Sequence, residues 1–407
     1  MHSIIRLKNG LKLIHKENRS PISHFGILVN AGTRDELPEK MGLAHFVEHT
    51  IFKGTEKRKA YQITKRLEDV GGELNASTSK EETYFHASFL SQDYERAIEL
   101  LADIFFHATF PEKELEKEKQ VIAEEIEYYN DTPSELIFDD FETLLFAGHP
   151  LSANILGNKK TLRHLHRTDI LEFIKQQYGV GTVVLSSVGQ ISLKKLVALC
   201  ERHFGQESVA EISRCRTPFT QLTPTQKTVR KNLTQTQLMV GTLAYSLQEE
   251  KRNAFTLLNN LLGGQGMNTR LNREIREKHG WAYSVESNYS PFSDCGLFTV
   301  YVGCDQENTD ACIEAIFKEL DKVKKNKLGT MQLHYAKKQL IGQNAIANES
   351  KLNEMLTIGR TALFSDEVET MEEYFENIER LTADDLLTVA NEIFDRERFS
   401  MLAFEKR

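Results

Sequence analysis

The sequence predicts an α+β fold made of two similar halves, each a β-sheet covered by helices. The main observation is an internal repeat near half the length of the 407-residue chain, in which elements of the same kind recur in the same order. The chain is also long enough for about two to four units with their own cores. A polar segment with two prolines separates the halves, as is typical of a linker. We therefore expect an N-terminal domain at 1–207, a linker at 208–226 and a homologous C-terminal domain at 227–407.

The repeat rests on elements read from hydrophobic periodicity and turn residues. Those expected in the first half are a strand at 23–36, a helix at 43–52, strands within 71–90, helices at 93–110 and 111–130, and a helix followed by a strand at 167–189. Those expected in the second half are a strand at 236–247, a helix at 252–264, strands at 281–290 and 296–304, helices at 309–325 and 331–346, and a helix followed by a strand at 382–407.

Composition excludes several classes of protein. The net charge is −8, with 51 basic and 59 acidic residues and no basic stripe, so nucleic acid is not an expected partner. No apolar run has membrane-spanning length, and the N-terminus lacks the pattern of a secretory signal. The five cysteines are odd in number and form no close metal-type pair, which fits reduced thiols. We expect a cytoplasmic protein without a membrane segment.

The sequence HFVEH at residues 45–49 is the most informative local motif. Helical spacing brings His45, Glu48 and His49 within one turn of each other. Two imidazoles supply most of a catalytic zinc site, which has three protein ligands and one position for water, and a non-ligating Glu would hold that water. The order H-x-x-E-H is the inverzincin pattern. We expect one Zn²⁺ per chain; the alternative is a structural role in which the three polar groups find separate hydrogen-bond partners.

A third ligand has to come from elsewhere in the first half. On the helix expected at 111–130, Glu118 and Glu125 lie two turns apart on the apolar face, whereas Glu124 and Glu127 point away from it. Glu125 is therefore the candidate third ligand, and Glu118 the candidate group that orients His45 or His49. The alternative is a wider surface face that carries both acids.

The second half cannot repeat this site. When the helix at 252–264 is aligned without gaps on the HFVEH helix, Ala254, Leu257 and Leu258 fall where the first half has His, Glu and His. We expect the second half to keep the scaffold and to serve another role.

These residues resemble a known family, the pitrilysin and insulysin peptidases, and within it the shorter members similar to the mitochondrial processing peptidase. HFVEH matches the family's zinc motif, and Glu125 follows His49 by 76 positions, the family's usual distance to its third ligand. The segment 71–87 resembles the family's substrate strand. The segment 263–285 resembles its glycine-rich loop, helix and strand, although Gln265 stands where a third glycine is common.

The resemblance implies a zinc-dependent endopeptidase that cleaves unfolded peptides or presequence-like segments. His45, His49 and Glu125 would bind Zn²⁺, and Glu48 would act as general base on the zinc-bound water. An extended substrate would add to a sheet edge at Asn75, Ala76 and Ser77 through main-chain hydrogen bonds.

The resemblance places two further catalytic groups in the second half, Arg276 and Tyr283, as donors to the tetrahedral intermediate. From the residues alone, an exposed helix Arg and an inward-facing strand Tyr are the simpler interpretation. Because two such two-domain units form a clamshell in the family, this chain resembles half of one. We expect a homodimer, or a heterodimer with a related subunit, in which Arg276 and Tyr283 come from the partner chain.

Two other functions compete with this one. A non-catalytic scaffold or peptide-holding subunit of the same fold needs no zinc, but its motif is usually broken, and here it is intact. A metal-dependent hydrolase of non-peptide substrates would leave the duplicated half and the substrate strand without a purpose.

Overall fold

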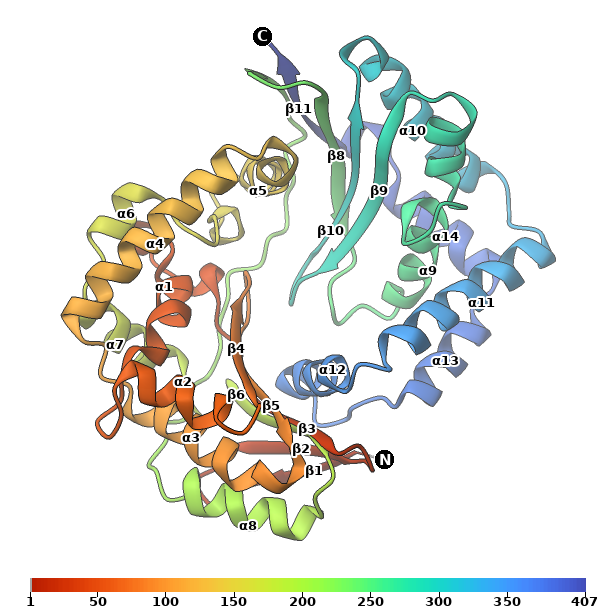
Figure 1. Cartoon of the computed structure of the whole chain (residues 1–407). Coiled ribbons are helices and arrows are strands. Elements are labelled where there is room, and N and C mark those ends of the chain that lie inside the picture. Colours follow the sequence, from red (N-terminus) through yellow and green to blue (C-terminus); the bar gives the residue numbers. More distant parts are fainter. Residues whose placement is uncertain (1) are drawn as a thin grey trace. The chain divides into compact units, whose positions relative to one another are not determined.

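Over residues 2–407, which the structure describes, the computed structural model contains one six-stranded and one five-stranded sheet, both flanked by helices (Figure 1). The first sheet has the spatial order β1 (Ser3–Arg6), β2 (Lys12–Glu17), β6 (Val183–Gly189), β3 (Ile22–Val29), β5 (Thr83–Leu90) and β4 (Glu73–Thr78). The second has the order β7 (Gln226–Lys231), β11 (Ser400–Lys406), β8 (Thr236–Ala244), β10 (Gly296–Cys304) and β9 (Ala282–Pro291).

The helices include all eight that the sequence predicts, in the predicted order, and six that it does not predict. In the first half they are α1 (Leu43–Thr50), α2 (Ala60–Glu68), α3 (Tyr94–His107), α4 (Glu112–Asn130), α5 (Pro133–Leu145), α6 (Lys159–Arg163), α7 (Arg167–Gln177) and α8 (Leu193–His203). In the second half they are α9 (Arg252–Gly263), α10 (Thr309–Lys325), α11 (Thr330–Ala347), α12 (Lys351–Phe364), α13 (Met371–Arg380) and α14 (Ala383–Ile393).

The two sheets share one topology, which confirms the predicted duplication. In the first, β3 pairs antiparallel with β5 and β6, β4 pairs with β5, and β2 runs parallel to β6. In the second, β8 pairs antiparallel with β10 and β11, β9 pairs with β10, and β7 runs parallel to β11. Strand β1 is an addition to the first sheet. The fold is therefore α+β, with two similar sheets each covered by helices.

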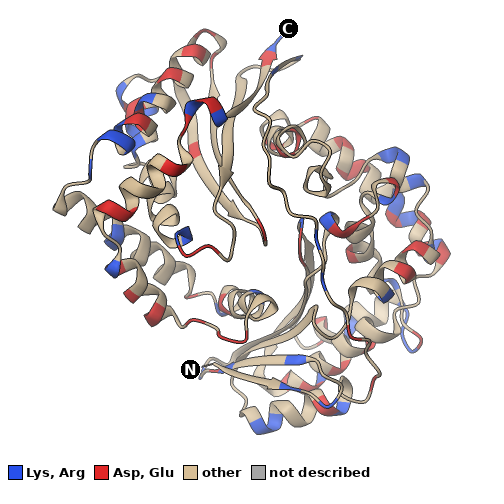
Figure 2. Cartoon of the chain, turned by 180° about the vertical axis from the view of Figure 1, so that it is seen from behind, with Lys and Arg blue, Asp and Glu red and all other residues tan. Residues whose placement is uncertain are grey.

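The central strands are buried along nearly their whole length, as expected when helices cover both faces of a sheet. Strands β6 and β10 are buried throughout, and β3 is buried from Ser23 to Val29. Figure 2 shows the complementary distribution of charge, because the Lys, Arg, Asp and Glu residues gather mainly on the helices.

The chain forms two compact units that do not follow the boundaries expected from the sequence. The first unit contains 1–127, 153–216 and 346–370, and the second contains 128–152, 217–345 and 371–407. Each half of the sequence thus contributes one segment to the other unit. The exchange is symmetrical, because α5 and α12 each follow the second of the two helices that come after the equivalent hairpins, β4–β5 and β9–β10.

The exchanged helix α12 covers one face of the first sheet, where it packs on β6, β3 and β2. Its apolar residues join those of the strands in one core, composed of Met355, Leu356, Ile358, Ala362 and Leu363 together with Ile14, Leu28, Val184 and Val188. The approach is close, since a Cβ on Gly359 would lie 2.7 Å from Leu28 Cδ1. The helices α1, α2 and α3 contact the strands β3, β4 and β5 of the same sheet.

The exchanged helix α5 does the same for the second sheet, where it packs on β8 and β11. It begins with Pro133 at its first helical position, where the missing N–H costs nothing. Its residues Leu136, Ile137, Phe141 and Leu145 pack with Met239, Leu297, Tyr301, Leu402 and Phe404 of the strands. The other face of this sheet is covered by α9, α10 and α14.

One predicted strand is shorter than expected, and this matters for the site. The strand expected at 23–36 ends at Val29, and residues 30–42 form a loop with two short 3-10 turns before α1. Pro38 lies in the second of these turns, where it cannot donate to a strand ladder. Among the described residues no helix is long and apolar enough to cross a membrane.

We predict that Met355→Ala lowers the free energy of unfolding by about 2–5 kcal/mol, because it leaves a cavity between α12 and the first sheet. Met355 is fully buried in that core. Urea denaturation followed by circular dichroism would measure the change, with Thr357→Ala on the exposed face of α12 as the control. Equal midpoints for the two variants would show that α12 is not a structural part of this unit.

Candidate metal centre

The short helix α1 presents the three polar residues of the HFVEH motif from an otherwise apolar segment. Leu43, Ala44, Phe46 and Val47 are buried, and so is His45. Glu48 and His49, at the next turn, are half-buried. The helix contacts the edge strand β4 and the helix α7 of the same unit, so its polar groups lie between packed elements and need partners there.

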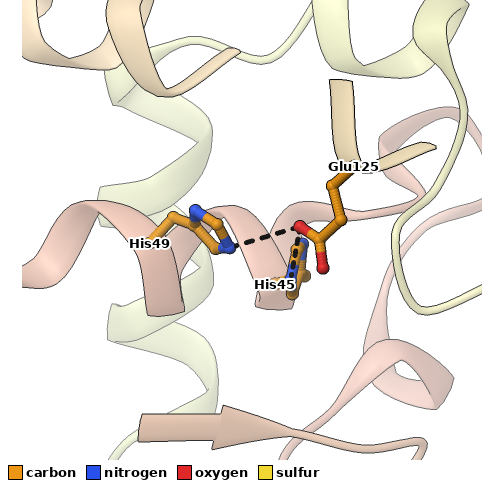
Figure 3. A group of neighbouring side chains, drawn as sticks. All are labelled: His45, His49 and Glu125. Atoms are coloured by element: carbon orange, nitrogen blue, oxygen red, sulfur yellow. Dashed lines mark ion pairs between the residues drawn. The ribbon is translucent and has the colours of Figure 1, made fainter. Parts of the chain in front are cut away.

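The structure brings His45, His49 and Glu125 together, as Figure 3 shows. Glu125 comes from α4 and points its Oε2 between the two rings, 3.8 Å from His45 Nε2 and 3.6 Å from His49 Nε2. Both separations are too long for hydrogen bonds. Two ligands that each lie 2.0–2.1 Å from one tetrahedral zinc are themselves about 3.3 Å apart. The separations are therefore close to those within a metal site.

The state of the His45 ring supports the same interpretation. Its Nδ1 is buried and has no hydrogen-bond partner among the described residues, and its Nε2 faces Glu125 beyond hydrogen-bond distance. A buried ring without partners is costly. A metal ion at Nε2 would supply a partner, so the donor set fits Zn²⁺, with two imidazoles and one carboxylate as ligands.

Glu118 lies on the same face of α4 as Glu125 and contacts the ring of a candidate ligand, His49. Its Oε2 is 3.3 Å from His49 Nδ1, and its Oε1 is 2.8 Å from Lys53 Nζ. A carboxylate in this position fixes the tautomer and orientation of a metal-binding imidazole. Of the two imidazoles, Glu118 therefore contacts that of His49. Glu124 and Glu127 lie off this face, since both are exposed and Glu127 pairs with Lys159.

Burial controls the charge of the two central groups of α1. Burial and, to a lesser extent, the neighbouring His49 together lower the pKa of His45 to about 3. His45 is therefore neutral at neutral pH, with a lone pair available for a metal. Burial raises the pKa of Glu48, interaction with Thr78 opposes the rise, and the Glu125 carboxylate adds to it. A carboxylate with a raised pKa is a better proton acceptor than a free one.

The predicted substrate strand lies beside Glu48. Asn75, Ala76 and Ser77 belong to β4, which within residues 2–407 pairs only with β5 and forms an edge of the first sheet. Thr78, the last residue of this strand, is the residue that interacts with Glu48. The free edge of β4 therefore ends at the candidate general base.

Arg276 and Tyr283 lie close to each other in the second unit, whereas the candidate metal ligands belong to the first. Arg276 is part of a π-helical segment, Asn272–Lys278, and Tyr283 is in β9. The guanidinium carbon is 5.0 Å from the centre of the Tyr283 ring. Tyr283 is 74% exposed, so it is not the inward-facing tyrosine of the simpler interpretation.

The second half has no counterpart of the metal ligands at the aligned positions. Ala254, Leu257 and Leu258 lie on α9 and are buried in the core of the second unit. At these positions α9 has buried apolar side chains where α1 has polar ones.

Sequence reasoning missed Lys53 and Thr78. Lys53 stands one helical turn after His49, and this spacing was the available signal for a residue close to the ligands. Thr78 has no comparable signal, because its proximity to Glu48 depends on how β4 lies against α1.

The fold and the H-x-x-E-H helix with a distant Glu define a metallopeptidase of the inverzincin class. Comparison with known families agrees with this definition. Residues 12–159 match "Insulinase (Peptidase family M16)", and residues 164–340 match "Peptidase M16 inactive domain". The chain belongs to the M16 peptidase family.

Its relatives carry names that fit the site. A Rickettsia felis protein named "Uncharacterized zinc protease" is 33% identical over 394 residues, which cover 96% of this chain and 95% of that protein. A Bacillus subtilis protein described as an uncharacterized zinc protease is 31% identical, with coverage of 96% and 95%.

Two solved structures share the fold. A protease from Helicobacter pylori aligns with a TM-score of 0.92 at 23% identity, covering 100% of this chain and 99% of that one. A structure from Pseudomonas fluorescens, described as a peptidase M16 inactive domain, aligns with a TM-score of 0.92 at 20% identity, covering 100% of this chain and 98% of that one.

We predict that Glu125→Gln lowers zinc affinity by more than about tenfold, because it removes one of three ligands. Glu124→Gln, on the neighbouring exposed position of α4, should bind zinc like the wild type. Competition with a chromophoric chelator would measure both affinities. Equal affinities in the two variants would exclude Glu125 as a ligand.

Proposed function

We propose that this chain is a zinc-dependent endopeptidase that hydrolyses unfolded peptides or presequence-like segments. The observation that carries the proposal is the convergence of His45, His49 and Glu125 beside Glu48, at the end of a free strand edge. Family membership and the names of the relatives support the same activity.

The chemistry divides between the ion and the protein. A bound Zn²⁺ would lower the pKa of a coordinated water and polarise the peptide carbonyl. Glu48 accepts the proton of the attacking water on its carboxylate and delivers it to the leaving amine. Burial, which raises its pKa, suits it to both steps. Glu118 and Lys53 keep the His49 ring in the orientation that binding requires.

The proposed substrate binds as an extended strand. Main-chain groups of Asn75, Ala76 and Ser77 on the free edge of β4 would pair with it, which selects an unfolded segment without depending strongly on its side chains. The scissile bond would then lie next to Glu48. This mode of binding does not suit a folded protein.

Arg276 and Tyr283 would donate to the negative oxygen of the tetrahedral intermediate. Their mutual contact and the exposure of Tyr283 leave the phenol accessible to a substrate. We propose that they act on the metal site of a partner chain, in a homodimer or in a heterodimer with a related subunit. An active monomer at assay concentration would falsify this part of the proposal.

The competing function is a non-catalytic scaffold or peptide-holding subunit. Such a subunit would use the β4 edge but would have no need for Glu48 or for three converging ligand atoms. The intact group favours catalysis.

The proposal also includes a cytoplasmic setting, because all five cysteines are free thiols and four of them are buried.

We predict that Glu48→Gln keeps its zinc and loses peptide hydrolysis by about 10²–10⁴-fold, because an amide cannot accept the proton. Hydrolysis of a quenched fluorescent peptide, combined with metal analysis of the same sample, would measure both properties. Full activity in the variant would exclude Glu48 as the base.

We predict that mixing His49→Ala with Tyr283→Phe restores activity above the sum of the two separate variants. In a mixed dimer one site would have both an intact metal centre and an intact tyrosine from the other chain. Mixing His49→Ala with Glu48→Gln is the control, because both changes damage the same centre. If Tyr283→Phe alone is inactive, no gain in the first mixture, from chains shown to exchange, would mean that Tyr283 acts within its own chain.

A further inference from the structure

The loop 30–42 that precedes α1 holds the first turn of that helix through one carboxylate. Glu36 Oε2 accepts a hydrogen bond from Gly42 N at 2.8 Å, and Glu36 Oε1 accepts one from Ala44 N at 2.6 Å. Ala44 directly precedes His45, so the second bond is one residue away from the first metal ligand.

The helix cannot supply this cap itself. Its N-cap residue is Gly42, which has no side chain and a φ of 90°. A Cβ at this position would lie 2.7 Å from Leu156 O, and a side-chain cap is therefore excluded by both backbone conformation and space. A carboxylate near a helix N-terminus satisfies free N–H groups and interacts favourably with the helix dipole. Glu36 provides the cap from six residues upstream.

Buried ion pairs hold the loop that carries Glu36. The neighbouring Asp35 accepts two hydrogen bonds from Arg216, at 2.9 and 2.7 Å, and a third from Gly32 N at 3.0 Å. Arg216 also reaches Glu81, which pairs with Arg34. Asp35 also pairs with Arg214, at 3.3 Å. The side chains of Arg34, Asp35, Glu81 and Arg216 are each at most 10% exposed.

The network joins three segments of the first unit that lie far apart in the sequence. Arg216 belongs to the segment between the two sequence halves, Asp35 to the loop before α1, and Glu81 to the turn between β4 and β5. Such pairs resist displacement, because breaking one leaves an uncompensated buried charge. The position of Glu36 is therefore set by contacts that do not involve the metal ligands.

We propose that Glu36 is a positioning residue for the metal centre, which fixes the first turn of α1 so that His45 meets His49 and Glu125 at one point. The inference rests on the metal site proposed above. Without both hydrogen bonds, the turn that bears His45 loses its anchor, while the core contacts of Phe46 and Val47 still hold the helix in the fold. Metal affinity is then more sensitive to Glu36 than stability is.

The test uses the full chain and Co²⁺ alone as the probe, since Co²⁺ binds the same kind of site as zinc and absorbs visible light. Glu36→Gln leaves one acceptor oxygen and turns an amide donor toward the other backbone N–H. We expect its Co²⁺ dissociation constant to rise about tenfold, with an altered visible spectrum. Equal constants and spectra in the variant and the wild type would overturn the proposal.

Two control variants separate positioning from general destabilisation. Glu39→Gln changes an exposed acid in the same loop. Phe204→Leu weakens the packing of a fully buried ring against Phe25 and Phe106 in the same unit. Both should bind Co²⁺ like the wild type. If Phe204→Leu weakens binding as much as Glu36→Gln for the same loss of thermal stability, Glu36 has only a structural role.

Two further measurements cover the cases in which Glu36→Gln does not fold or the metal site itself is absent. If Glu36→Gln does not fold, Glu36→Asp takes its place, because the shorter side chain keeps the carboxylate but cannot reach both Gly42 N and Ala44 N. It should weaken Co²⁺ binding in the same direction, and wild-type affinity in that variant would overturn the proposal. If wild type and His49→Ala bind Co²⁺ equally, the metal site itself is absent, and the failure belongs to the proposed function.

Discussion

A buried imidazole has to be satisfied by something other than water, and this requirement organises the first unit. His45 lies on an apolar helix and is itself buried, and no described group lies within hydrogen-bond distance of its ring, so a partner for that ring would stabilise the helix. The carboxylate of Glu125 arrives from α4 to face it, and Glu118 with Lys53 completes the surroundings of the neighbouring His49. The packing of α4 and the chemistry of the site therefore both follow from the need to give the buried His45 ring a partner.

The sequence was informative where geometry is local. Helical spacing alone grouped His45 with Glu48 and His49, and Glu118 with Glu125, because residues three, four or seven positions apart share a face whatever surrounds the helix. Contacts across the fold were not accessible in this way. Glu36 was assigned to a strand, and its hydrogen bonds to α1 depend on the course of a loop that periodicity does not describe.

The same distinction between local spacing and contacts across the fold explains why the duplication was predictable and the domain boundaries were not. The duplicated topology was predictable because equivalent elements recur in the same order along both halves. The segments around α5 and α12 were left unassigned, and these two helices are exchanged between the units. An amphipathic helix reveals that it has an apolar face, but nothing in its own residues states which of two similar sheets will cover that face.

The exchange of α5 and α12 also bears on the origin of the chain. A half-length ancestor with this order of elements would have covered its sheet with a helix from a second copy, as in a domain-swapped dimer. Joining the two copies through the segment that now carries Arg216 would have turned an association dependent on concentration into a permanent one. In the joined chain only one copy needs the imidazoles, and Ala254, Leu257 and Leu258 stand at the aligned positions of the other.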